Sequence, residues 1–234
     1  MDFLSLYTIF ASKWSKMISM NKNERYVITI NRELGSGGRT VGEKLAERLG
    51  VAFYDKAVIK ALVEKFHLTV EEIERLKGQK NNWWSEIKRV LSAGNAFVIA
   101  PYNDMSVEAE SDIPTTEAMF RAEKEILKGI VEHESCVIAG RCGFHVMREH
   151  PNHLSVLIQA PMEQRIQRVM TRQGLSHEEA EAAIQRVDKM RENYVTKYTK
   201  TSRYDTRNYD LVISMAGKTE DDAVALIMNY KKKA

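Results

Sequence analysis

The sequence predicts an α/β fold built around a parallel sheet, in one domain that carries a small insertion. The strand candidates are short, continuous apolar runs, which is typical of strands that helices bury on both faces. Helical patterns separate these runs, and such alternation favours parallel βαβ winding. The chain has 234 residues, enough for one domain of this class to bury a core.

Strands are expected at residues 26–31, 51–54, 136–139, 154–159 and 210–214. After the first strand, Val41, Leu45 and Leu49 have the spacing that buries one face of a helix. Other expected helices lie at 57–66, after a capping box at 69–72, from Pro161 to Arg172, from a capping box at 176–179 to about Tyr198, and at 221–231.

A glycine-rich turn, Glu33-Leu-Gly-Ser-Gly-Gly-Arg-Thr40, joins the first strand to its helix. Glycines let successive backbone N–H groups and a helix N-terminus converge on an anion, so the turn predicts phosphate binding. It nearly fits the phosphate loop G-x-x-x-x-G-K-[ST], with Gly38 and Thr40 in register and Arg39 in place of lysine. Arginine keeps a cation beside the β- and γ-phosphates, and the Thr40 hydroxyl suits Mg²⁺ coordination.

Two other interpretations of this turn stay open. Gly35 and Gly37 also suit a dinucleotide loop, G-x-G-x-x-G, with Asp55 as its ribose-binding acid, although Thr40 stands where the third glycine would fall. The second is a glycine-rich turn that binds no ligand.

Composition gives no reason to expect nucleic-acid or membrane partners, because the net charge is only +3. Cys136 and Cys142 have neither disulfide-framework nor zinc spacing, which fits a reducing cytosol, and we expect a cytoplasmic protein. The pair His150 and His153 lacks further metal ligands at suitable spacing and is expected to lie in a solvated turn.

Residues 1–24 are expected to be an N-terminal extension of a domain that spans 25–234. The apolar run Phe3–Ala11 is too short to span a bilayer, and no positively charged region precedes it. We expect residues 1–20 to be dispensable or to result from an upstream start codon. An amphipathic membrane anchor is the alternative.

Arginine placement is the second informative feature. Arg165, Arg168 and Arg172 lie on one face of a helix at i, i+3 and i+7, and Gly174 is a reasonable hinge before the next helix. That helix carries Arg186, Asp188 and Arg191. Phosphoryl transfer needs cations that neutralise the phosphates and a closing segment that excludes water. Two solvated amphipathic helices are the alternative.

The third feature lies at the ends of two expected strands. In a parallel sheet, ligands gather beyond the carboxyl ends of the strands. Arg141 is therefore well placed to bind a phosphate or carboxylate of an acceptor. Asp55 can hold a magnesium-bound water or orient an acceptor hydroxyl, or it can act as the N-cap of the following helix.

Residues 77–115 break the alternation of strands and helices. Trp83-Trp84, Val90-Leu91 and Phe97-Val-Ile99 lie there among glycine, asparagine and acidic residues. We interpret this segment as an insertion that covers the acceptor pocket or as an oligomer contact, with plain core as the alternative.

Four segments have a distinctive sequence: Ile28-Thr-Ile-Asn-Arg-Glu-Leu-Gly-Ser-Gly-Gly-Arg39, Phe53-Tyr-Asp-Lys56, Ile138-Ala-Gly-Arg141 and the late pattern Val187-Asp-Lys-Met-Arg191…Tyr194…Tyr198…Tyr209-Asp-Leu211. Through these segments, residues 25–230 resemble the bacterial cytidylate kinase-like proteins. It implies the P-loop nucleoside-monophosphate kinase fold, a three-layer fold with a five-stranded parallel sheet, a mobile lid and an acceptor-binding region. It also implies transfer of the γ-phosphoryl group of ATP to a small acceptor with Mg²⁺.

Site residues follow from the resemblance together with the patterns above. The ATP phosphate loop is expected to comprise Gly35, Ser36, Gly37, Gly38, Arg39 and Thr40. Catalytic cations are expected at Arg39, Arg168, Arg172 and Arg191. Acceptor contacts are expected at Asp55, Arg141, Arg186 and Asp188, and metal contacts at Thr40 and Asp55. Adenine is expected near 214–217.

Two positions depart from cytidylate kinases. These enzymes have lysine where this chain has Arg39, and an aspartate that helps read cytosine where this chain has Cys142. A thiol cannot replace an acid that accepts a hydrogen bond from an exocyclic amine. CMP is therefore the leading acceptor within a broader kinase prediction.

Other functions remain as alternatives to an ATP-dependent kinase. They are a kinase of a non-nucleotide small molecule, a nucleotide-binding regulator without turnover, and a dinucleotide-dependent oxidoreductase. The expected partner is a small-molecule phosphoryl acceptor, and the chain is expected to be a monomer or a homo-oligomer.

Overall fold

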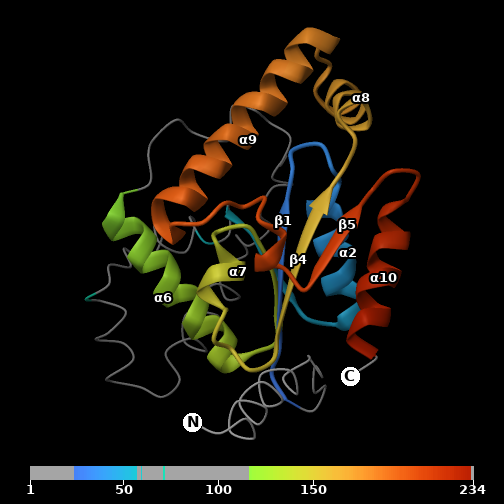
Figure 1. Cartoon of the computed structure of the whole chain (residues 1–234). Coiled ribbons are helices and arrows are strands. Elements are labelled where there is room, and N and C mark those ends of the chain that lie inside the picture. Colours follow the sequence, from blue (N-terminus) through green and yellow to red (C-terminus); the bar gives the residue numbers. More distant parts are fainter. Residues whose placement is uncertain (1–23, 57–58, 60–70, 72–115, 233–234) are drawn as a thin grey trace, which may run out of the picture.

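The computed structural model describes residues 24–56, 59, 71 and 116–232 (Figure 1). Its centre is a five-stranded sheet in the order β2-β3-β1-β4-β5, and every pairing is parallel. The strands are β1 (Val27–Arg32), β2 (Ala52–Tyr54), β3 (Cys136–Ala139), β4 (His153–Gln159) and β5 (Leu211–Ser214). The predicted parallel α/β fold is thus confirmed, with each strand within one residue of its expected bounds.

Helices cover both faces of the sheet. Their bounds are α2 (Gly38–Leu49), α6 (Glu117–His133), α7 (Gly143–Val146), α8 (Met162–Gln173), α9 (His177–Thr199) and α10 (Glu220–Lys232), with a short 3-10 turn at Thr206–Asn208. Figure 1 shows α2 and α10 on one face, α6 and α7 on the other, and α8 and α9 as a helical pair beyond the carboxyl ends of the strands.

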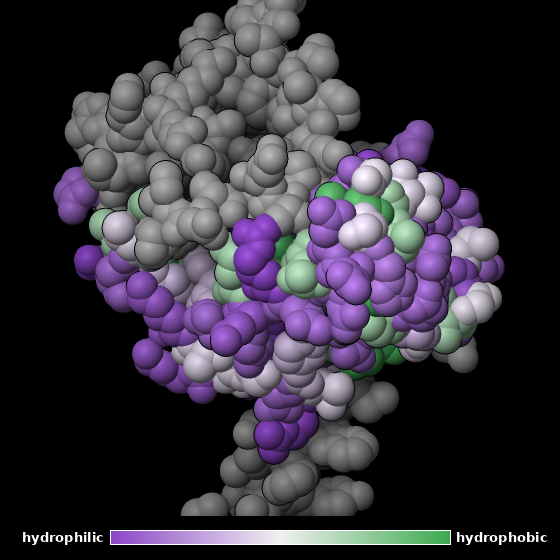
Figure 2. Space-filling view, turned by 90° about the horizontal axis from the view of Figure 1, so that it is seen from above, coloured by the Kyte–Doolittle hydropathy of each residue, from purple (hydrophilic) through white to green (hydrophobic). Residues whose placement is uncertain are grey.

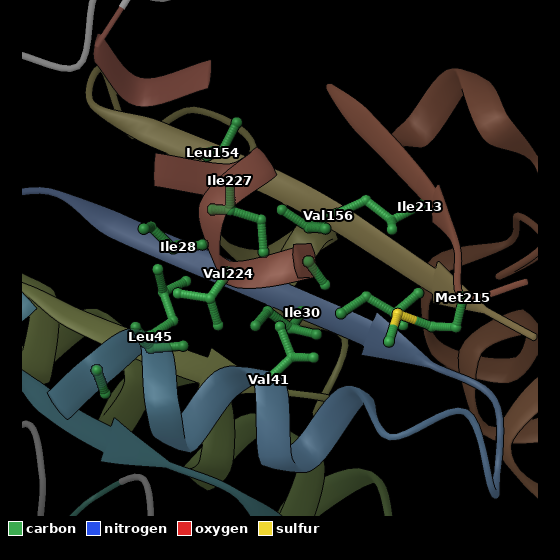
Figure 3. Close-up of a cluster of buried hydrophobic side chains, with 14 of the residues drawn as sticks. Ile28, Ile30, Val41, Leu45, Leu154, Val156, Ile213, Met215, Val224 and Ile227 are labelled. Atoms are coloured by element: carbon green, nitrogen blue, oxygen red, sulfur yellow. The ribbon is translucent and has the colours of Figure 1, made fainter. Parts of the chain in front are cut away.

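Side chains of β1 point alternately to the two faces of the sheet, so they contribute to two separate hydrophobic clusters. Val27 packs with Ile126 and Ile130 of α6, whereas Ile28 and Ile30 point toward α2 and α10. Figure 3 shows the second cluster, which also contains Val41, Leu45, Leu154, Val156, Ile213, Met215, Val224 and Ile227. Each such side chain stabilises the fold by about 1.5–3 kcal/mol on burial, so these contacts hold the sheet rigid beneath the site at its edge.

Local signals explain the helix ends. Ser176 and Glu179 form the predicted capping box of α9. Helix α8 follows Pro161 as expected and ends at Gly174, which adopts the left-handed conformation with φ +69°. Helix α6 was not singled out in the sequence, although Thr116 caps it by accepting a hydrogen bond from the Met119 N–H.

Several predictions fall largely outside the described residues. They are the N-terminal extension at 1–24, the helix at 57–66, the capping box at 69–72 and the insertion at 77–115. Among the described helices, none is long and apolar enough to cross a membrane. Figure 2 shows the molecule from the side of α8 and α9, where hydrophilic residues cover most of the coloured surface.

Candidate active site

The glycine loop lies between the carboxyl end of β1 and the first turn of α2. Gly35 and Gly37 have φ values of +80° and +81°, which glycine adopts without strain. Gly37 is the N-cap of α2. Because a glycine N-cap has no side chain to accept from the N–H groups of the first turn, these groups can bind an anion.

Helix α8 packs directly on this loop. A Cβ atom on Gly35 would lie 2.8 Å from the backbone oxygen of Arg165, and one on Gly37 would lie 2.9 Å from Nη1 of Arg168. At Gly35 the approach of the α8 backbone requires glycine in addition to the φ angle. At Gly37 the near atoms are the ends of flexible side chains, so the φ angle is the main requirement. The sequence predicted the arginines of this helix as phosphate-neutralising residues of a closing segment, and it did not predict that the helix packs on the loop.

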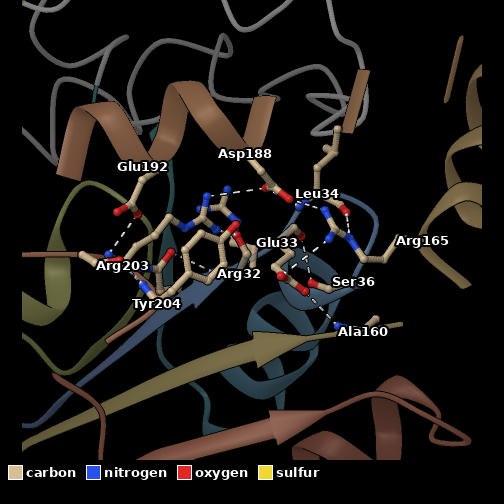
Figure 4. Close-up of polar contacts among 12 residues, drawn as sticks. Arg32, Glu33, Leu34, Ser36, Ala160, Arg165, Asp188, Glu192, Arg203 and Tyr204 are labelled. Carbon is tan, nitrogen blue, oxygen red and sulfur yellow. Dashed lines mark hydrogen bonds and ion pairs between the residues drawn. The ribbon is translucent and has the colours of Figure 1, made fainter. Parts of the chain in front are cut away.

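Hydrogen bonds within the loop fix its shape. The Ser36 hydroxyl donates to the Glu33 carbonyl at 2.9 Å and accepts from the Gly38 N–H at 3.3 Å. The Glu33 carboxylate, at the position of the usual first glycine, accepts from the Ala160 N–H at 3.0 Å and lies 3.5 Å from Nη1 of Arg165 (Figure 4). Glu33 thus anchors the loop to the end of β4.

Asp188 connects α8 and α9, which we call the lid helices, to the glycine loop. Its carboxylate accepts from the Leu34 N–H at 3.0 Å and forms ion pairs with Arg165 and Arg203 (Figure 4). Arg203 is fully buried and also donates to the Arg32 carbonyl at the end of β1. Burial and the nearby charge of Arg191 lower the pKa of Arg203, although Asp188 opposes this shift. Asp188 therefore lies in a buried polar network.

Arg39 and Asp55 are brought together by α2 and β2. Asp55 is 1% exposed, and its Oδ2 atom lies 3.0 Å from Nε of Arg39. Arg39 also lies 3.1 Å from Glu43, one turn further along α2. The arginine at the usual lysine position is thus bound by two carboxylates.

The other predicted arginines have different surroundings. Arg168 pairs with Glu220, the first residue of α10, beside Gly37. Arg172 and Arg186 are exposed, and Arg191 is half-buried near Arg203. The structure therefore places Arg168 at the loop and leaves Arg172 and Arg186 on the surface of the lid helices.

Arg141 lies beyond the carboxyl end of β3, as predicted. Arg141 and Cys142 both adopt the left-handed conformation, with φ values of 54° and 53°. Nη1 of Arg141 lies 3.2 Å from Oε2 of Glu123 on α6, and its guanidinium lies over the ring of Tyr194 on α9. Burial opposes the charge of Arg141, but the carboxylate of Glu123 raises its pKa.

Sequence reasoning missed three residues of this region: Glu123, Arg203 and Glu220. Glu123 lies on the helix that was not singled out, and Arg203 lies in an irregular segment after α9. An acidic residue among the apolar positions of α6 was the available signal for Glu123. The sequence offered no comparable signal for Arg203 or Glu220.

The donor set allows Mg²⁺ at the loop. In the described part of the chain, no group of three or more His, Cys, Asp or Glu side chains is arranged to hold a metal. Mg²⁺ usually keeps several waters and binds through one or two protein oxygens and substrate phosphates. The Thr40 hydroxyl in the first turn of α2 fits this role, and Asp55 fits it on release from Arg39.

Fold and site together define the class of protein. The parallel sheet, the glycine loop after β1 and the lid helices form the P-loop nucleoside-monophosphate kinase fold, on which nucleotide-dependent kinases of small molecules are built. The sequence model of the Cytidylate kinase-like family matches residues 27–216, and the chain belongs to this family.

The chain is similar to several known proteins. The cytidylate kinase of Methanopyrus kandleri is 25% identical over 202 residues, which are 86% of this chain and 90% of that protein. An uncharacterized protein from Eubacterium ventriosum shares the fold, with a TM-score of 0.61 and 24% identity over 90% of this chain and all of its own. The shikimate kinase of Bacteroides thetaiotaomicron gives a TM-score of 0.45 at 16% identity over 89% of this chain and 99% of its own.

Proposed function

We propose that the protein transfers the γ-phosphoryl group of ATP to a small acceptor, a nucleoside monophosphate such as CMP, with Mg²⁺. One observation carries this proposal: two cationic sites lie at the same edge of the sheet. Arg168 stands beside Gly37 after β1, and Arg141 follows the neighbouring strand β3. A donor phosphate and an acceptor can therefore meet across the ends of adjacent strands.

On the donor side, Gly35–Thr40 would hold the phosphates through backbone N–H groups. The Thr40 hydroxyl and Asp55 would hold Mg²⁺, which would neutralise the negative charge of the phosphates. Charge that develops on the transferred group would be stabilised by Arg39, Arg168, Arg172 and Arg191. For Arg172, which is exposed at the end of α8, this role requires the lid to close.

On the acceptor side, Arg141 and Asp55 would bind directly, with Arg186 from the lid. Asp188 would act by holding Leu34, Arg165 and Arg203, since its carboxylate is already engaged with all three. An acceptor phosphate oxygen would attack the γ-phosphorus, the bond to the β,γ-bridging oxygen would break, and ADP would leave with that electron pair.

A nucleotide-binding regulator without turnover is the second candidate. The observation that favours it is the ion pair between Arg39 and Asp55, which engages the cation of the loop with a buried carboxylate. ATP would still bind to the loop amides, but the cation would not reach the β- and γ-phosphates unless this pair opened.

The deciding experiment measures consumption of ATP with Mg²⁺ in the presence of CMP, dCMP, UMP, AMP, GMP, small alcohols or no acceptor. Acceptor-dependent ADP formation with one nucleoside monophosphate is the expected result. Turnover with an alcohol alone would instead indicate a kinase of a non-nucleotide molecule. ATP binding without turnover on any acceptor would favour the regulator. GTP in place of ATP tests the donor.

A further inference from the structure

Arg32 is the last residue of β1, and its side chain lies between two glycines that follow neighbouring strands. A Cβ atom on Gly38, the first residue of α2, would lie 2.5 Å from the Cβ atom of Arg32. A Cβ atom on Gly140, directly after β3, would lie 2.5 Å from Nη1 of Arg32. The stem of this side chain therefore packs against the glycine loop, and its guanidinium reaches the loop after β3.

The two glycines place Arg32 between the donor side and the acceptor side of the proposed site. Gly38 belongs to the loop that would hold the donor phosphates, whereas Gly140 precedes Arg141, the proposed acceptor contact. Strands β1 and β3 pair in parallel, and the Gly140 N–H donates to the Ile30 carbonyl at 3.0 Å. Gly140 is thus tied to the strand that ends in Arg32, so the guanidinium lies where the two halves of the site meet.

Gly38 shows how closely the stem of Arg32 packs on the loop. Its φ angle is not positive, unlike those of Gly35, Gly37 and Gly140, so its backbone conformation alone would accept another residue. The Cβ and Cγ atoms of Arg32 would lie 2.5 and 3.1 Å from a Cβ atom at this position. Glycine is therefore needed at 38 to let the arginine stem pass.

Hydrogen bonds hold the backbone of Arg32 in place. Its N–H donates to Oδ1 of Asn31 at 2.9 Å, and its carbonyl accepts from the buried guanidinium of Arg203. The Asn31 amide in turn donates to the Tyr209 hydroxyl at 2.6 Å. Residues after α9 therefore fix the position from which this side chain starts, and a cation fixed in advance needs little rearrangement when charge develops beside it.

A cation at this point matches what phosphoryl transfer requires. Negative charge spreads over the equatorial oxygens of the transferred group, which lies between the attacking and leaving oxygens. A guanidinium carries five N–H donors in a rigid plane and can bind oxygens of two phosphate groups at once. Arg39, at the usual lysine position, is bound by Asp55 and Glu43. Arg32 is 7% exposed, so little water screens its charge.

We propose that Arg32 is a catalytic residue, which donates hydrogen bonds to the phosphoryl group as this group passes from donor to acceptor. This inference rests on the proposed function. Arg32 would stay protonated: the acceptor oxygen bonds to the γ-phosphorus, the bond to the β,γ-bridging oxygen breaks, and ADP takes that electron pair. Because Arg32 belongs to the sheet, this cation would be in place before the lid helices close.

Arg32→Lys tests the inference, because lysine keeps the charge but loses the planar set of donors. With ATP, Mg²⁺ and the panel acceptor that gives turnover, we expect kcat to fall about 10²- to 10³-fold, while the affinities for ATP alone and for the acceptor alone change less than about threefold. Binding of ADP, aluminium fluoride and the acceptor together, which mimics the group in transfer, should weaken in proportion to kcat. The matched control is Arg48→Lys on α2, where the side chain pairs with Asp221, and it should leave these quantities unchanged.

Arg32→Ala adds a test that a merely structural role would not pass. Guanidinium chloride far below denaturing concentrations should restore part of kcat, because the free ion can occupy the space of the lost side chain. Urea has a similar planar shape without the charge and should not restore activity. Arg48→Ala should respond to neither compound.

Gly140→Ala covers the case in which the Arg32 variants do not fold. The new Cβ would displace Nη1 of Arg32, so we expect a lower kcat with unchanged affinity for the acceptor. Gly50→Ala is the matched control, because Gly50 also has a positive φ angle and nothing lies within 4 Å of its Cβ position. Melting temperatures report the folding of every variant.

Three results would overturn the inference and leave the proposed function intact. They are a kcat of folded Arg32→Lys within about threefold of the unsubstituted protein, equal losses of kcat and ATP affinity, and equal kcat in Gly140→Ala and Gly50→Ala. If the unsubstituted protein gave no turnover with any acceptor of the panel, the proposed function would fall together with the inference.

Discussion

Nε of Arg39 lies 3.0 Å from Oδ2 of Asp55, so the cation of the phosphate loop is bound to the carboxylate that ends β2. The sequence placed both residues in the site, but it did not predict their contact. Asp55 is 1% exposed, and a buried charge of this kind requires a counterion. Arg39 therefore has a structural role in addition to any role toward phosphate.

Arg39→Met should lower the free energy of unfolding by about 1–3 kcal/mol, because it removes this cation from a buried carboxylate. The double variant Arg39→Met with Asp55→Asn should recover part of the loss, since a neutral amide tolerates burial better. Urea denaturation of both single variants and the double variant gives the coupling energy. Strictly additive losses would contradict an energetic link between the two residues.

Thr40→Ala should reduce kcat in the presence of Mg²⁺ far more than it reduces the affinity for ATP measured without metal. The hydroxyl lies in the first turn of α2, where a metal ligand is needed, whereas the loop amides that bind phosphate remain. Steady-state kinetics over a range of Mg²⁺ concentrations and calorimetric ATP titration provide the comparison. Thr206→Ala, at an exposed residue before β5, is the matched control. If Thr40→Ala reduced kcat and the affinity for ATP by the same factor, that result would argue against a metal contact.

Gly35→Ala should destabilise the protein more than Gly174→Ala, although both glycines have positive φ angles. Both substitutions place an alanine at a positive φ angle, and this strain costs about 1 kcal/mol in each variant. Only at Gly35 would the new Cβ meet backbone atoms, 2.8 Å from the Arg165 oxygen, whereas nothing lies within 4 Å at Gly174. Thermal unfolding of the two variants measures the difference. Equal melting temperatures would show that α8 can move off the loop at little cost.

Glu220→Gln should tighten ATP binding about two- to fivefold, the range expected for one partly exposed ion pair. Glu220 holds Arg168 beside Gly37, so phosphate groups must compete with its carboxylate for this guanidinium. Calorimetric titration measures the change. Asp221→Asn removes the same charge from the next residue, which pairs with Lys44 and Arg48, and should change the affinity less. Weaker binding by Glu220→Gln would show that Glu220 supports the nucleotide.

Stability should fall as pH decreases from about 6.5 to about 4 because of His153. Burial and the neighbouring charge of His150 lower its pKa to about 4 from an ordinary value of 6.5. In this window the unfolded chain binds a proton that the folded protein does not, so the stabilisation is complete above pH 6.5 and is lost toward pH 4. The loss is up to about 3 kcal/mol.

His153→Gln isolates this effect from the titration of carboxylates. Urea denaturation at pH 7.5 and pH 4.5 should show a smaller fall in the variant than in the unsubstituted protein. The imidazole also contacts the Thr29 hydroxyl at 2.8 Å, so the variant will lose some stability at both pH values. Parallel pH profiles of the two proteins would assign the acid sensitivity to other groups.

Local patterns in the sequence predicted the strands, the glycine loop and the capping box of α9, because each depends on residues close together in the chain. Contacts between distant residues were beyond such patterns. Tyr194 and Glu123 are 71 positions apart, and Arg203 and Arg32 are 171 apart. Arg141 was predicted from its place after a strand, but its buried partners depend on how α6 and α9 pack. Asp188 was predicted as an acceptor contact, whereas its neighbours became visible only in three dimensions.

The contacts of Asp188 have a thermodynamic consequence for substrate binding. One carboxylate holds Leu34 of the donor loop, Arg165 of α8 and Arg203, which contacts the end of β1. If a donor that orders the loop also orders this network, it prepares the lid for the acceptor. Positive cooperativity between the two substrates then follows. Because such coupling is reciprocal, each substrate would raise the affinity of the other by the same factor, and loosening Asp188 would reduce both enhancements equally.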